Sequence, residues 1–271
     1  MKTLITALWF ASNLVAAAAF AQAMPPNADG VTMGHLHLNS RDIDVNKKIF
    51  VGMGGTAVAP EGAAIQYVRF PGVIVMLNLP NATAPASGGT EGTVINHVGF
   101  LVPNVQEAAA RWKAAGVPVL PGNNGRADQA FVVTPDGLRV EILEDKSQTI
   151  PIRFQHIHYF VPAAAIPDIQ SWYAKNFGAT PGMRGTNQSD DIPGANLTFS
   201  KTDMPTVPTK GRVLDHIGFD VTDLDATAKR LEANGLTLDR PIVTQPNGNK
   251  LSFVHDQWGT GIELNERHQP M

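Results

Sequence analysis

The sequence predicts an α+β fold of four βαβββ modules, each about sixty residues long. Three observations lead to this prediction: a histidine-bearing strand pattern occurs four times, a helical pattern follows it, and short extended stretches complete each repeat. The strand patterns are GHLHLNS, NHVGFLV, QHIHYFV and DHIGFDV, whose first histidines are His35, His97, His156 and His216. These histidines are separated by 62, 59 and 60 residues.

A helix is predicted directly after each of these strands. In the second repeat Asn104 can cap a helix over VQEAAARWKAAG, which Gly116 would end. In the fourth repeat Thr222 or Asp223 can cap the helix of TDLDATAKRLEANG, which Gly235 would end. The segments DIDVNKKIFVGMGG and IPDIQSWYAKNFGA have the same position in the first and third repeats. Boundaries between modules are expected near residues 88, 150 and 208, with ATAPASGGTEG and KTDMPTVPTKG as connectors.

The N-terminus has the layout of a secretory signal peptide. A basic start is followed by the mostly apolar LITALWFASNLVAAAAF and by the small-residue site AQA, so residues 1–23 are expected to be removed. We therefore expect a periplasmic or secreted protein without a stable membrane anchor. The chain has no cysteine, which excludes disulfides and thiolate ligands, and its net charge of -3 gives no indication of nucleic-acid binding.

Two of the repeats close in the same way, with TPDGLRVEILE and DQWGTGIELNE. Aligning Gly137 with Gly259 places Glu141 opposite Glu263. Each glutamate alternates with apolar neighbours, so it lies on the opposite face of its strand from the apolar side chains. By the same alternation, the first histidine of each opening strand faces away from the helix. The predicted sheet thus has one face covered by the helix and one concave face that carries His and Glu.

Modules that open with H-x-G-F-x-V and close with D-P-x-G-x-x-x-E-L resemble those of the vicinal oxygen chelate superfamily. This superfamily includes glyoxalase I, extradiol dioxygenases, fosfomycin-resistance transferases and methylmalonyl-CoA epimerase. The resemblance implies that two modules pair into a half-barrel around a metal, so that four modules form two half-barrels. We therefore expect a glyoxalase/dioxygenase-like domain over residues 24–149 and a second one over residues 150–271.

The resemblance also implies a set of metal ligands on the first and last strands of paired modules. Pairing the first two modules would bring together His35, His97 and Glu141, and pairing the last two would bring together His156, His216 and Glu263. The fourth ligand position holds Met76 in one half and Thr198 in the other, and neither is an expected ligand. Two imidazoles and one carboxylate with open positions suit Fe²⁺ best, with Mn²⁺ or Zn²⁺ as alternatives.

Three further histidines are candidates for chemistry. His37 and His158 share a face with the predicted ligands, and the sequence leaves open whether they are extra ligands, acid–base groups or residues that line the cavity. His255 precedes Asp256 near a strand end and could reach the cavity rim. His158 and His255 are therefore the candidate catalytic residues.

We expect an exported, divalent-metal-dependent enzyme that acts on a small vicinally oxygenated molecule, with dioxygenase-like or lyase/isomerase-like chemistry. Three ligands per half differ from the four expected of glyoxalase I. The segments KLSFVHDQWGTGIE and TQPNGNK lack the Tyr and His expected of a catechol dioxygenase. A homodimer is compatible with the sequence. The alternative is a protein that binds a small molecule without metal, as bleomycin-resistance relatives do.

Overall fold

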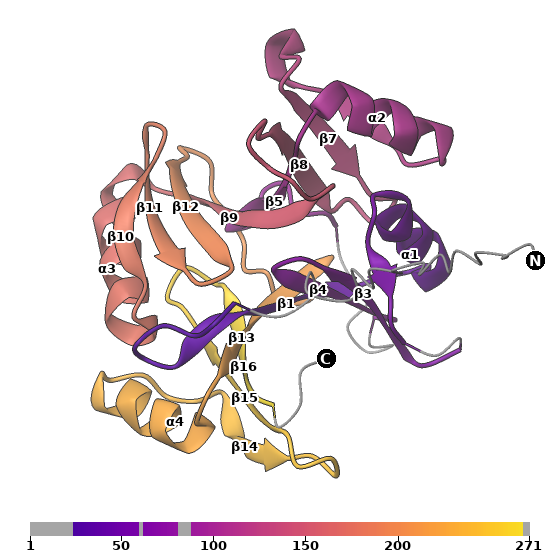
Figure 1. Cartoon of the computed structure of the whole chain (residues 1–271). Helices are drawn as coiled ribbons and strands as arrows, with labels where there is room; N and C mark the ends of the chain where they lie inside the picture. The colour runs from indigo at the N-terminus through magenta and orange to yellow at the C-terminus, as the bar shows by residue number, and fades with distance from the viewer. Residues whose placement is uncertain (1–23, 60–61, 81–87, 268–271) are drawn as a thin grey trace, which may run out of the picture.

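The computed structural model describes residues 24–59, 62–80 and 88–267. The signal peptide predicted over residues 1–23 lies outside the described residues. Figure 1 shows that the chain forms two curved sheets with the helices placed around them. The two sheets contain eight strands each.

Each of the four modules has the predicted order of one strand, one helix and three strands. The first contains β1 (Val31–Asn39), α1 (Ile43–Gly52), β2 (Thr56–Ala57), β3 (Ile65–Phe70) and β4 (Val73–Asn78). The second contains β5 (Ile95–Val102), α2 (Val105–Ala114), β6 (Val119–Pro121), β7 (Gln129–Val133) and β8 (Arg139–Glu144). The third contains β9 (Arg153–Val161), α3 (Ile166–Phe177), β10 (Thr180–Arg184), β11 (Asn187–Ile192) and β12 (Ala195–Lys201). The fourth contains β13 (Leu214–Val221), α4 (Leu224–Ala233), β14 (Arg240–Thr244), β15 (Lys250–His255) and β16 (Gly261–Glu266).

The helices begin where the sequence places capping side chains. Asn104 accepts a hydrogen bond from the backbone N–H of Glu107, and Asp223 accepts one from Ala226, which satisfies a free N–H group at each helix start. The helix α3 ends at Gly178, which has the left-handed conformation that glycine adopts without strain. The connectors predicted near residues 88, 150 and 208 lie between the modules, although part of the first lies outside the described residues.

The pairing of modules differs from the sequence prediction. One sheet has the order β14-β15-β16-β13-β1-β4-β3-β2, so the first module pairs with the fourth. The other has the order β10-β11-β12-β9-β5-β8-β7-β6, so the second module pairs with the third. We call these the 1–4 half-barrel and the 2–3 half-barrel. The expectation that modules one and two, and three and four, each share a half-barrel is therefore wrong.

The first and second modules, and the third and fourth, contact each other through their helix-covered sides instead. The rings of Phe70 and Phe100, from the first and second modules, have centroids 4.9 Å apart. The rings of Phe177 and Phe219, from the third and fourth modules, have centroids 5.1 Å apart. All four rings are fully buried, so the core is shared between the two half-barrels. The alternation predicted for the fourth opening strand is thereby confirmed, because Phe219 faces this core while the neighbouring histidine faces the concave side.

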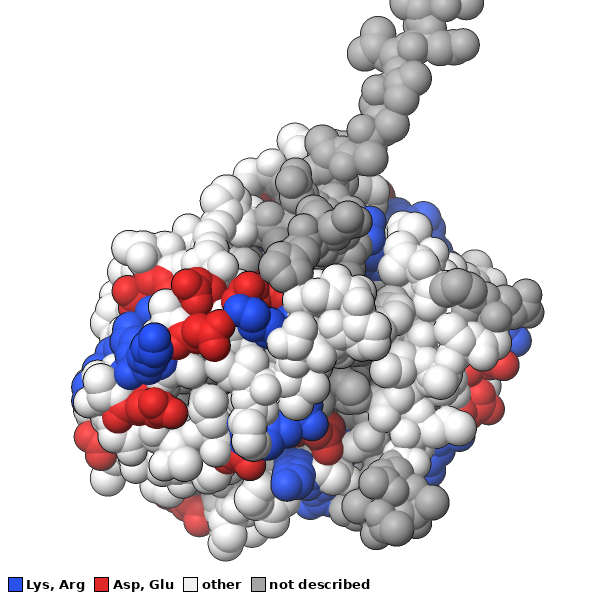
Figure 2. Space-filling model, turned by 90° about the horizontal axis from the view of Figure 1, so that it is seen from below, with Lys and Arg blue, Asp and Glu red and all other residues white. Residues whose placement is uncertain are grey.

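The surface carries mixed charge. On the face seen in Figure 2, basic and acidic side chains are interspersed with uncharged ones. Among the described residues, no helix has both the length and the apolar character needed to cross a membrane.

Candidate metal centres

The opening strands of paired modules run antiparallel, and their histidine patterns are complementary. In the 2–3 half-barrel, His97 lies opposite His158 and Gly99 lies opposite His156. In the 1–4 half-barrel, the same arrangement places His37 opposite His216 and His35 opposite Gly218. An H-x-H strand therefore always faces an H-x-G strand, and each glycine leaves room for an imidazole from the other strand.

A glutamate joins each histidine group from the neighbouring parallel strand. Glu141 on β8 lies beside Gly99, and Glu263 on β16 lies beside Gly218. Each concave face thus collects three imidazoles and one carboxylate whose potential ligand atoms lie within 4.8 Å of one another. The two groups are His97, Glu141, His156 and His158, and His35, His37, His216 and Glu263.

These groups correct the predicted ligand sets. His35 does not join His97 and Glu141 but lies with His216 and Glu263, because β1 pairs with β13. Correspondingly, His156 and His158 lie with Glu141 rather than with Glu263. The predicted side chains all lie on concave faces, as expected, but they are divided between the two faces differently.

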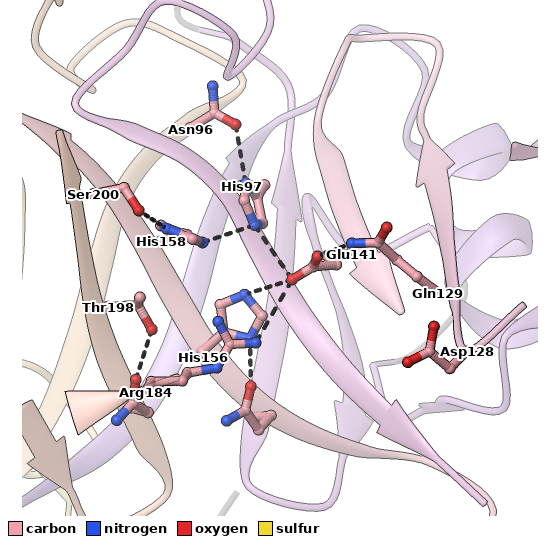
Figure 3. A network of polar contacts seen from close by, with 12 residues as sticks. Asn96, His97, Asp128, Gln129, Glu141, His156, His158, Arg184, Thr198 and Ser200 are labelled. Carbon is pink, nitrogen blue, oxygen red and sulfur yellow. Dashed lines mark hydrogen bonds and ion pairs between the residues drawn. The ribbon is translucent and has the colours of Figure 1, made fainter. Parts of the chain in front are cut away.

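In the 2–3 half-barrel, both predicted imidazole ligands point at one carboxylate oxygen (Figure 3). The Nε2 atoms of His156 and His97 lie 3.2 and 3.5 Å from Oε2 of Glu141. The other oxygen of Glu141, Oε1, accepts a hydrogen bond from the side-chain amide of Gln129. This bond fixes the carboxylate while leaving Oε2 directed at the two imidazoles.

The second nitrogen of each of these rings is held by an amide oxygen. His97 Nδ1 lies 2.9 Å from Oδ1 of Asn96, and His156 Nδ1 bonds Oε1 of Gln155. Because these oxygens only accept, the proton of each neutral ring is on Nδ1 and the lone pair is on Nε2. His156 Nε2 is buried without a hydrogen-bond partner in the described structure. Such outer partners and an unused Nε2 are typical of imidazoles that bind metals.

His158 connects this centre to a hydroxyl group. Its Nδ1 lies 3.1 Å from Nε2 of His97, and its Nε2 lies 2.7 Å from Oγ of Ser200. A chain of hydrogen bonds therefore runs from Ser200 through His158 to His97. Thr198, in the position predicted to hold no ligand, lies beside His158 and donates its hydroxyl to Asn196 at 2.6 Å.

The 1–4 half-barrel has the same donor atoms but different outer contacts. His216 Nε2 lies 2.9 Å from Oε2 of Glu263, and its Nδ1 lies 2.7 Å from Oδ1 of Asp215. His35 Nε2 is 3.6 Å from the same Glu263 oxygen, but Nη2 of Arg267 donates to His35 Nδ1 at 3.4 Å. A guanidinium only donates, so this contact places the imidazole proton on Nε2, which is the atom that would have to bind a metal.

The other side chains of the 1–4 site do not supply a partner that would move the His35 proton away from Nε2. His37 stacks on His216 with ring centroids 4.3 Å apart, and its Nδ1 is buried without a partner in the described residues. Met76 lies beside His37, in the position predicted to hold no ligand. Asp220 accepts a hydrogen bond from Nε of Arg267 at 2.8 Å.

Burial and close contacts set the protonation of both groups. Burial lowers the pKa of His37 and of His156 to about 4, and that of His158 to about 2. Burial opposes the charge of His216 as well, but hydrogen bonds to Asp215 and Glu263 raise its pKa above the ordinary value. Burial also disfavours the charged glutamates, yet their close contacts with the histidines hold the pKa of both carboxyls well below the usual range.

His255 lies outside both groups. Its side chain is 67% exposed, and its Nδ1 lies 2.6 Å from Oδ1 of Asp239. It lines the rim of a cleft of about 660 Å³ whose wall also contains His216, Phe253 and Arg240. This cleft belongs to the 1–4 half-barrel.

Sequence reasoning missed the residues that distinguish the two centres. Asn96, Gln155 and Asp215 each precede a histidine of the two groups, whereas Gly34 precedes His35. This difference is visible in the sequence and could have indicated that one histidine lacks an outer partner. Gln129, Arg184 and Arg267 reach the centres from other strands or from the chain end, and no local pattern marks them.

Comparisons with known proteins agree with this architecture. Residues 153–264, from β9 into β16, match the family model described as Glyoxalase/Bleomycin resistance protein/Dioxygenase superfamily. A search of curated protein sequences gave no match.

Solved structures have the same fold at low sequence identity. Glyoxalase I from Zea mays is similar with a TM-score of 0.67 and 16% identity, over 87% of this chain and 92% of that one. A proposed dioxygenase from Bacillus subtilis is similar with a TM-score of 0.62 and 16% identity, over 92% and 87% of the two chains. The cppA protein from Streptococcus pneumoniae gives a TM-score of 0.51 and 12% identity, over 86% and 98%. The family match covers the third and fourth modules, and the solved structures show that the described chain has the glyoxalase fold of two half-barrels.

Proposed function

We propose that the protein is a divalent-metal-dependent enzyme whose metal centre lies in the 2–3 half-barrel. The observation that carries this proposal is the buried Nε2 atom of His156, which has no hydrogen-bond partner among the described residues and points at Glu141 while Nδ1 of the same ring bonds Gln155. Nε2 of His35 in the 1–4 half-barrel is unpaired as well, but Arg267 contacts the Nδ1 atom of that ring. An unpaired polar atom in a buried place is costly, and a bound cation would remove that cost. The substrate would be a small molecule with two neighbouring oxygens.

The donor set fits such a cation. His97, His156 and Glu141 would hold it, and this combination suits Fe²⁺, with Mn²⁺ or Zn²⁺ as alternatives. Asn96, Gln155 and Gln129 orient these three side chains. When bound, the metal would supply a Lewis acid that polarises substrate oxygens, and Fe²⁺ would add redox capacity.

His158 and Ser200 would transfer the proton that such a reaction requires. The hydrogen bond from Ser200 to His158 and that from His158 to His97 place one imidazole between the centre and a hydroxyl group. A metal on Nε2 of His97 would free Nδ1 of His158 from this contact, so His158 could exchange a proton with the substrate at Nδ1 and with Ser200 at Nε2. Isomerase, lyase and dioxygenase reactions all require such a transfer beside the metal.

The choice of half-barrel follows from the outer contacts. Both proposed histidine ligands of the 2–3 site donate Nδ1–H to an amide oxygen, whereas His35 in the 1–4 site receives a hydrogen bond from Arg267 at that atom. Metal binding by His35 would force its Nδ1 proton toward the guanidinium. We therefore expect one bound metal per chain.

For the 1–4 half-barrel we propose a second function, the binding of a small molecule without metal. The cleft of about 660 Å³ next to His216 supports it, because its wall combines the Phe253 ring with polar groups. In this reading one half-barrel performs chemistry and the other holds a ligand.

The metal proposal is tested by metal content. Tag-free protein, reconstituted with Fe²⁺ without oxygen and then desalted, should retain about one equivalent by elemental analysis. Glu141→Gln should lose most of it while the far-UV circular dichroism is unchanged, since the substitution removes a charge and keeps the size. Glu263→Gln and the exposed control Glu232→Gln should keep it. If Glu141→Gln binds as much metal as the wild type, the proposal is wrong.

The reaction class is tested separately on the metal-loaded protein. Dioxygen uptake over a panel of catechols and hydroxyketones would indicate an oxygenase. Conversion of the same compounds without dioxygen would indicate an isomerase or lyase. Export of the protein is also part of the proposal, and protein from the native host should begin at Met24 when its N-terminus is sequenced.

A further inference from the structure

Arg184 reaches into the 2–3 centre from the far edge of the sheet. It is the last residue of β10, the edge strand, while Glu141 lies on β8 on the other side of the central pair β9 and β5. The curvature of the sheet brings Nη2 of Arg184 to 3.7 Å from Oε2 of Glu141. In Figure 3 the Arg184 side chain extends toward His156 and Glu141.

The guanidinium of Arg184 has few partners for a side chain that is mostly buried. Its side chain is only 21% exposed, and Glu141 is the ion-pair partner that the described residues offer it. Burial lowers the pKa of Arg184, and the charge of Glu141 opposes this effect. A guanidinium has five N–H donors in a planar fork, so one contact at 3.7 Å leaves most of them available.

Metal binding would remove even this partner. The Glu141 oxygen that faces Arg184 is also the one that faces His97 and His156. Once Glu141 is a ligand, two positive charges of the metal and one of Arg184 face a single negative charge, because the histidine ligands are neutral. A buried excess of positive charge is unfavourable, so an anionic ligand is needed beside the metal.

We propose that Arg184 binds the carboxylate of the substrate, and that the substrate is a small 2-hydroxy or 2-oxo carboxylic acid. The fork of the guanidinium matches a carboxylate, and an oxygen on the adjacent carbon supplies the second member of the vicinal pair. This inference rests on the proposed metal centre and adds the charge of the substrate to it.

The 1–4 half-barrel has no equivalent group among its described residues. Glu263 is paired there with His35 and His216 but with no arginine, and Arg267 is engaged with Asp220. The carboxylate-binding residue therefore occurs in the same half-barrel as the better-formed metal centre.

The test compares two probes of similar size on the full chain loaded with Co²⁺. Glycolate carries a carboxylate next to a hydroxyl, and hydroxyacetone carries a neutral carbonyl there. Binding is followed by calorimetry and by the visible spectrum of Co²⁺. The wild type should bind glycolate at least 10-fold more tightly than hydroxyacetone. Arg184→Met should weaken glycolate binding by about 10- to 100-fold, with Co²⁺ content and hydroxyacetone affinity unchanged.

Two further variants sharpen the result. Arg184→Lys keeps the charge but loses the fork, so it should recover only part of the glycolate affinity. Arg126→Met removes an exposed arginine that pairs with Asp128, and it should have no effect. Equal glycolate affinity in the wild type and a Co²⁺-loaded Arg184→Met protein would overturn the inference and leave the metal centre intact. Failure of the wild type to bind Co²⁺ would overturn the proposed function, and the inference with it.

Discussion

Gly99 lies directly opposite His156 across the β5–β9 ladder, and the imidazole of His156 occupies the space in which a side chain at position 99 would begin. Gly218 has the same relationship to His35 in the other half-barrel. The glycine of the H-x-G pattern is therefore required by a ring on the partner strand. Neither glycine has a positive φ, so its role is to provide space and not an unusual backbone conformation.

The first prediction concerns this glycine. Gly99→Ala should displace the His156 ring, lower metal affinity by about 10- to 100-fold and destabilise the fold by about 1–3 kcal/mol. Metal titration and thermal unfolding measure the two effects. Gly182→Ala is the matched control, since its added methyl group would meet only a backbone oxygen at 4.0 Å. Unchanged metal affinity in Gly99→Ala would show that His156 is not a ligand.

The second prediction concerns the contact between Arg267 and His35. Arg267→Gln removes the donor that places the His35 proton on Nε2, so metal content should rise from about one to about two equivalents per chain. Arg240→Gln, which makes the same change in charge in the same half-barrel, should stay at one. Two equivalents in the wild type would contradict the proposed difference between the centres.

The sequence was sufficient to predict the modules and the face of the sheet that carries histidine and glutamate, but not which modules pair. An H-x-H strand needs an H-x-G partner, and both the second and fourth modules offer one, each with a closing glutamate. Either pairing yields the same set of donors, so no residue in the repeats distinguishes them. The decision depends on packing between the helix-covered sides, where Phe70 meets Phe100 and Phe177 meets Phe219. The helix-covered sides of all four modules are equally apolar in sequence, so the sequence does not indicate which of them pack together.

The third prediction tests this pairing in solution. Leu101 lies opposite Arg153 on neighbouring antiparallel strands, so cysteines at these two positions should form a disulfide on mild oxidation. The pair Leu101→Cys with Thr32→Cys would be adjacent if the first two modules shared a sheet, and it should stay reduced. The natural chain has no cysteine, so peptide mapping will report only the introduced pair. A disulfide in the Leu101→Cys, Thr32→Cys protein and none in the Leu101→Cys, Arg153→Cys protein would mean that the first two modules share a sheet, as the sequence suggested.

The last prediction concerns Asp190, a fully buried residue on β11 that lies away from both centres. Burial and the neighbouring charge of Asp191 raise its pKa from 3.8 to about 7. The folded state therefore keeps this proton up to about pH 7, whereas the unfolded state loses it above about pH 4. Because the unfolded state binds fewer protons over that range, this residue makes stability fall as pH rises, by at most about 4 kcal/mol. Asp190→Asn, which cannot ionise, should unfold several degrees above the wild type at pH 8 and show little difference at pH 4. Thermal unfolding across this range measures the effect, with the exposed Asp203→Asn as control. A constant difference between Asp190→Asn and the wild type at all pH values would mean that Asp190 titrates normally, in which case its burial carries no protonation cost.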